Sequence, residues 1–153
     1  MLYISNFFYL LLLIIIINNF INKINPRQFF IASIIIVVVD YFALQLFLAP
    51  LFKEFIPNIQ NKPMKFKFIP AIISYFFIAF VFYYFIIANN ASIIDAFLLG
   101  LSIYGIYEAT NMAIFDNWPI KALIADTLWG GSLFAISTFI FQSFTQISNK
   151  LFP

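Results

Sequence analysis

The sequence predicts an all-α integral membrane protein, a single transmembrane domain over residues 1–153 built as a bundle of five helices. The chain is 64% hydrophobic and only 9% charged, whereas soluble domains carry about 25% charged residues. A chain of 153 residues cannot enclose so much apolar surface in one core, because small folds leave a large share of their surface exposed. The apolar residues also gather into five runs near the length of about 20 residues that a membrane-spanning helix needs.

The first two helices are expected over residues 2–20 and 26–52. The first run is short, and a signal peptide is the alternative. It has no basic start and no small-residue cleavage site before Asn18 and Asn19, so a retained helix is the favoured interpretation. The second helix is expected to begin with Asn25 as its N-cap and Pro26 in its first turn, where a missing backbone N–H costs nothing.

The other three helices are expected over residues 68–88, 93–115 and 119–141. Pro70 lies in the first turn of the third helix. Ser92 and Asp95, three residues apart, have the pattern of a capping box at the start of the fourth. The fifth is expected to begin at Pro119, with Asp116 or Asn117 as its cap.

The longest connection is expected over Lys53–Lys67, and it is rich in lysine. The simpler interpretation is a solvated loop, and binding of anionic lipid headgroups is the more specific one. With five spans, the N-terminus, this loop and the turn before the last helix share one side of the membrane. That side carries five of the eight Lys and Arg residues (Lys53, Lys62, Lys65, Lys67 and Lys121). The positive-inside rule then predicts a cytoplasmic N-terminus and a cytoplasmic Lys53–Lys67 loop.

The composition also excludes several kinds of chemistry. The chain has no Cys and no His, which removes disulfides, thiol catalysis, the commonest metal ligand and the usual neutral-pH base. The net charge of +2 is small and scattered, which argues against nucleic acid as a partner. We therefore expect no cofactor and no metal. The expected partners are the lipid bilayer and other membrane proteins, a second copy of this chain included.

Three of the six acids, Asp40, Glu108 and Asp126, lie well inside predicted spans. An ionised carboxylate at the centre of a spanning helix costs roughly 2.5–3.5 kcal/mol, and no Lys or Arg lies at matching depth. We therefore expect at least one of the three to be protonated at rest or to hold a cation. Glu108 and Asp126 lie nine residues on either side of Asn117, so each is about 13 Å from the turn, and Asp40 is within roughly 6 Å of their level.

The neighbours of these acids predict an inward, tightly packed face. Tyr104, Glu108 and Asn111 share one side of the fourth helix. Small residues repeat at the spacing that lets membrane helices approach closely: Gly105, Ala109 and Ala113 in the fourth helix; Thr127, Gly131 and Ala135 in the fifth, beside Gly130. Trp118 is interpreted most simply as an interfacial anchor. Trp129 lies deeper, and it either donates its N–H to a carboxyl or faces lipid.

The stretch from Tyr107 to Gly131 resembles an uncharacterised family of small membrane proteins, the domain-of-unknown-function family 2177. The family pattern Tyr-Asp-x-Thr-Asn, Trp-Pro and Asp-x-x-Trp-Gly is matched by nine residues: Tyr107, Glu108, Thr110 and Asn111; Trp118 and Pro119; Asp126, Trp129 and Gly130. Asp40 matches more loosely, so the resemblance spans residues 29–141. Glu108 stands where the family has Asp, and Ala43 stands where a Trp is expected.

The resemblance implies a multi-pass membrane protein with a four-helix core, to which the first helix is an addition. It implies that Asp40, Glu108, Asn111 and Asp126 belong to one unit, and it implies no known activity. Three functions stay open: a structural or assembly role, in which polar groups join helices; proton or cation transport, with an oligomer supplying the pore; and an enzyme acting on a lipid or isoprenoid. The lack of a nucleophile–base pair argues against the enzyme.

Overall fold

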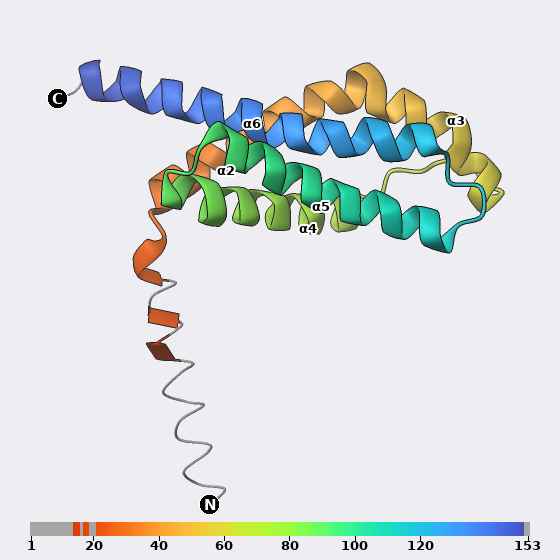
Figure 1. The fold of residues 1–153 in the computed structure, drawn as a ribbon, viewed down its shortest axis with the longest axis horizontal. Helices are drawn as coiled ribbons and strands as arrows, with labels where there is room; N and C mark the ends of the chain where they lie inside the picture. Colours follow the sequence, from red (N-terminus) through yellow and green to blue (C-terminus); the bar gives the residue numbers. More distant parts are fainter. Residues whose placement is uncertain (1–13, 16, 19–20, 152–153) are drawn as a thin grey trace, which may run out of the picture.

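The computed structural model describes residues 14–15, 17–18 and 21–151, and this part of the chain is helical without strands. The main elements are, in order, α2 (Pro26–Ala43), the π-helical turn η1 (Leu44–Leu48), α3 (Ala49–Gln60), α4 (Phe68–Val81), the π-helical turn η2 (Phe82–Ile86), the 3₁₀ turn η3 (Ile87–Asn89), α5 (Ile93–Ile114) and α6 (Ile120–Leu151). Figure 1 shows these helices running back and forth along one axis as a bundle.

The described residues provide four helices that are long and apolar enough to cross a membrane: Pro26–Gln60, Phe68–Asn89, Ile93–Ile114 and Ile120–Ile147. These correspond to four of the five predicted spans. The fifth predicted helix, over residues 2–20, lies mostly outside the described residues. The apolar side chains on the outside, such as Ile69 and Ile94, each more than 70% exposed, are suited to lipid contact.

The helix starts follow the sequence closely. Asn25 caps α2 by accepting hydrogen bonds from the backbone N–H groups of Arg27 and Gln28. Ser92 and Asp95 form the predicted capping box at α5, with both reciprocal bonds present. The cap predicted for α6 is wrong, because that helix begins at Ile120 and Asp116 and Asn117 lie in the turn before it.

Two predicted helix ends are also wrong. The second span continues past Phe52 through Lys53 to Gln60, which leaves only residues 61–67 as the connection. The helix continues because α3 has an apolar side. Its Phe55 packs on Trp118, in the α5–α6 turn, and on Ala122 of α6. Beyond the π-helical turn and Pro50, the helix arches away from the line of α2 (Figure 1). At the other end, α6 runs on past residue 141 and projects beyond the bundle (Figure 1).

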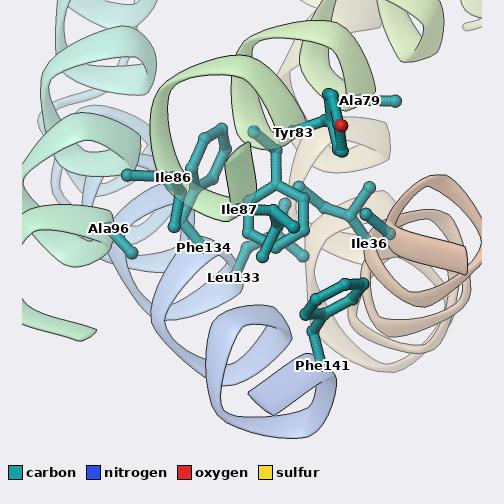
Figure 2. Packing of buried hydrophobic residues seen from close by; sticks show 11 residues of the cluster. Ile36, Ala79, Tyr83, Ile86, Ile87, Ala96, Leu133, Phe134 and Phe141 are labelled. Atoms are coloured by element: carbon teal, nitrogen blue, oxygen red, sulfur yellow. The ribbon is translucent and has the colours of Figure 1, made fainter. Parts of the chain in front are cut away.

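The main core lies near the end of the bundle where η2 and η3 lead into α5. There Phe82 and Phe134, both fully buried, meet edge to face with ring centroids 5.5 Å apart. Ile36 of α2 and Leu133 of α6 converge on the same place (Figure 2). This end of the bundle is therefore filled with apolar side chains.

The contact between α5 and α6 is very close. A Cβ on Gly100 would lie 2.2 Å from the carbonyl oxygen of Gly130, and a Cβ on Gly130 would lie 2.2 Å from the Tyr104 ring. Two further members of the predicted seam, Gly105 and Thr127, face each other. Ala109 and Ala113, however, are exposed. That half of the seam is wrong, because residues four apart are rotated by about 40° at each step round an α-helix, so the row turns away from α6.

Candidate functional site

Asp40 joins three helices through neutral hydrogen-bond donors. Its Oδ2 accepts a bond of 2.8 Å from the Tyr75 hydroxyl of α4, and its Oδ1 accepts a bond of 2.8 Å from the Trp129 indole N–H of α6. The Asp40 side chain is buried. Both carboxyl oxygens therefore have a partner, and of the two alternatives for Trp129 the carboxyl contact is the one present.

Glu108 of α5 is fully buried and is only half satisfied. Its Oε2 accepts a bond of 2.7 Å from the Trp118 indole N–H. Its Oε1 has no hydrogen-bond partner in the part of the chain that the structure describes. The anchor interpretation of Trp118 is wrong, because this ring is buried between the Phe55 and Phe115 rings, with centroids 5.1 and 5.8 Å away.

Asp126 of α6 completes the cluster. Its buried carboxyl contacts that of Glu108, and it also lies near Asp40. The three acids thus come together although 86 residues separate the first from the last. Among the residues described, Lys121 and Glu54 form the one ion pair, and no group of three acidic side chains could hold a metal ion.

The other predicted polar residues divide into two groups. Tyr104 lies beside the acids and against Gly130. Thr110 is exposed and takes no part in the cluster, and Asn111 is outside it as well, in a separate hollow beside Trp118. The side-chain amide nitrogen of Asn111 is buried there and has no partner among the described groups.

Sequence reasoning missed Tyr75, although a signal was present. It is the only tyrosine before Tyr83 in a span otherwise made of Ile, Phe and Ala with few polar residues. It lies eight residues after Lys67, hence about 12 Å along the helix, which is close to the depth estimated for the acids. A hydroxyl at that depth needs an acceptor, and Asp40 supplies it.

A cleft of about 300 Å³ opens beside the acids. Its apolar walls come from η1, α3, α4 and the loop before α4, including Leu44, Leu48 and Ile78. Its polar lining comes from Asp40, Ser74, Tyr75, Tyr104, Tyr107 and Asp126. A second hollow of about 260 Å³ between α4 and α5 also reaches Asp126. Asp40 and Asp126 therefore face a space large enough for part of a ligand, whereas Glu108 lines neither hollow.

The matched region of a known family coincides with this bundle. The family described as "Predicted membrane protein (DUF2177)" matches residues 26–142. The chain belongs to this family. The match covers all three acids, Trp118 and Trp129, and it excludes the N-terminal run, as the resemblance implied. No curated protein and no solved structure shows significant similarity to the chain.

Proposed function

We propose that this member of the family is a lipid-binding membrane protein. The cleft beside α4 and α5 takes an apolar chain from the bilayer, and a polar group of the ligand meets Asp126. The observation that carries the proposal is an apolar cleft lined by Asp126, a buried acid whose carboxyl contacts that of Glu108. Binding sites for small molecules are mostly apolar, with a few convergent polar groups.

The three acids divide their roles in this proposal. Asp40, with a donor on each oxygen, holds α2, α4 and α6 together, which is the structural role expected of polar groups inside a membrane. Glu108 and Asp126 face each other, and two ionised carboxylates in contact repel strongly in apolar surroundings. The pair is stable when it shares a proton. Asp126, the member of the pair that lines the cleft, then offers a hydrogen-bonding oxygen to a hydroxyl or amide of a ligand.

Transport across the bilayer fits less well. Along α6, the side chains that follow the acid pair lead into the core, where Phe82, Leu133 and Phe134 have no exposed surface. A proton or cation released at Asp126 would therefore need a path through close-packed apolar side chains.

Catalysis on the bound lipid is the second candidate. It is favoured by the contact between two carboxyls at the edge of a cleft, since one protonated and one ionised carboxyl can serve as acid and base. Comparing lipid extracts of cells with and without the gene tests it, and an unchanged lipid profile would count against catalysis while leaving binding untouched.

Matched serines of α4 and α5 provide the test of binding. Ser74 and Ser102 are both exposed, and each donates its hydroxyl to the carbonyl four residues before it, but only Ser74 lines the cleft. The full chain is extracted with gentle detergent, and retained lipids are counted by native mass spectrometry. Ser74→Trp is expected to abolish retention, whereas Ser102→Trp keeps it. Equal retention by both variants and the unchanged protein would refute the proposal.

A further inference from the structure

A further hollow, distinct from the cleft and from the hollow between α4 and α5, has a volume of about 280 Å³ and lies at the loop that joins α3 to α4. It is lined by Gln60, Lys62, Pro63, Lys65 and Lys67. The lysine cluster, defined as Lys62, Lys65 and Lys67, thus surrounds a concave surface. Among the described residues none of the three is in an ion pair. The acid nearest in sequence, Glu54, is paired with Lys121 at 2.7 Å.

The loop that carries the lysine cluster is held in place by its own hydrogen bonds. The side-chain amide of Gln60 donates to the backbone carbonyls of Lys62 and Pro63, at 3.0 and 3.1 Å. Asn61 turns the chain with a left-handed backbone, at a φ of 53°. Since the loop is folded back on the end of α3, the hollow is formed before any ligand arrives.

The lysine cluster lies next to the apolar cleft. Phe66, which lies between Lys65 and Lys67 in sequence, lines the cleft beside the acids. Gln60 also lines the neighbouring hollow that holds Asn111, whose buried amide nitrogen lacks an acceptor. The positive charge of the lysine cluster, the unused Asn111 donor and the apolar cleft therefore lie near one another at one end of the bundle.

We propose that the lysine cluster binds the phosphate of an anionic lipid whose chain enters the cleft. The inference rests on the proposed function and adds the chemical class of the ligand. Basic pockets beside membrane helices suit phosphate-bearing headgroups, and an ammonium group is a common phosphate ligand. From Lys67 to the level of Tyr75 is about 12 Å along α4, so the phosphate stays clear of the acids, and a part of the lipid further from the phosphate meets Asp126.

The experiment measures lipid preference by native mass spectrometry of the full chain offered equal amounts of phosphatidylglycerol and phosphatidylcholine. The test variant replaces the lysine cluster by glutamine (Lys62→Gln, Lys65→Gln and Lys67→Gln). The matched control makes the same change in charge elsewhere, at Lys23, Lys53 and Lys150, which do not line the hollow. Each lysine near an anionic lipid contributes about fivefold in affinity.

The unchanged protein and the control variant are expected to retain phosphatidylglycerol in preference to phosphatidylcholine. The test variant is expected to bind both lipids equally, and Ser74→Trp neither. A test variant that keeps the preference overturns the headgroup site alone, provided that Ser74→Trp still removes binding. Excess inorganic phosphate is expected to leave the lipid bound, and displacement by phosphate would show a site for a free anion instead.

Discussion

Replacing Glu108 by glutamine is expected to leave the stability of the bundle nearly unchanged. The glutamine carbonyl can accept the 2.7 Å bond from the Trp118 indole, and its amide can donate to Asp126, which the native residue does only when it carries a proton. Hydrogen bonds between membrane helices are worth about 0.6 kcal/mol on average. The free energy of unfolding should therefore change by less than about 1 kcal/mol.

Glu108→Leu, of similar volume, supplies the contrast. It removes both contacts and leaves the buried indole N–H of Trp118 without an acceptor, which costs about 1–3 kcal/mol. Both variants are compared by unfolding in mixed micelles at increasing fractions of sodium dodecyl sulfate. The near-ultraviolet circular dichroism of Trp118 and Trp129, the only two tryptophans, reports the packing. If glutamine destabilises the bundle as much as leucine does, the ionised carboxylate of Glu108 stabilises the bundle, and the hypothesis that Glu108 and Asp126 share a proton is wrong.

Two further predictions use the same unfolding titration. Gly130→Ala is expected to cost about 1–3 kcal/mol, because its Cβ would lie 2.2 Å from the Tyr104 ring, whereas Gly105→Ala, whose nearest atom is at 3.3 Å, should cost clearly less; equal effects would contradict the close α5–α6 contact. Asp40→Asn should lower the free energy of unfolding by about 1–3 kcal/mol, because the new NH₂ group must face one of the two donors, Tyr75 or Trp129. The control Asp116→Asn, in the exposed turn, should change it by no more than about 0.5 kcal/mol. If Asp40→Asn has no effect, Asp40 does not accept both hydrogen bonds.

The bundle was largely predictable because hydropathy and helix caps are local signals. Runs of apolar residues set the four spans, and Asn25 and Ser92 mark helix starts by bonds to residues two or three positions away. The end of the second span was missed because α3 contains Lys53, Glu54 and Pro57, which resemble a loop in composition. Its helix depends on Phe55 packing against Trp118, a contact between residues far apart in sequence.

The depth of the acids was predictable, and the inward side of α5 was predictable in part. Counting residues from the turn placed Glu108 and Asp126 at one level, and the structure brings them into contact. Helical spacing correctly turned Glu108 inward, but it also grouped Asn111 with the acids, whereas Asn111 lies in a different hollow and its amide nitrogen has no partner among the described groups. The role of Trp118 depends on the packing of α3, for which the sequence offers no comparable pattern, whereas the depth of Tyr75 in its span was a signal that could have been used.

The choice of donors explains how this chain keeps three acids in a membrane without a cation. An ammonium or guanidinium partner would bring a second charge that must also lose its water. Trp and Tyr side chains instead carry their N–H or O–H donor on a largely apolar ring, which suits them to a bilayer. Trp118, Trp129 and Tyr75 supply three such donors, fewer than three carboxyls can accept. The missing donors are at Glu108 and Asp126: a shared proton can join the two carboxyls, and a ligand donor can reach Asp126, which lines the cleft.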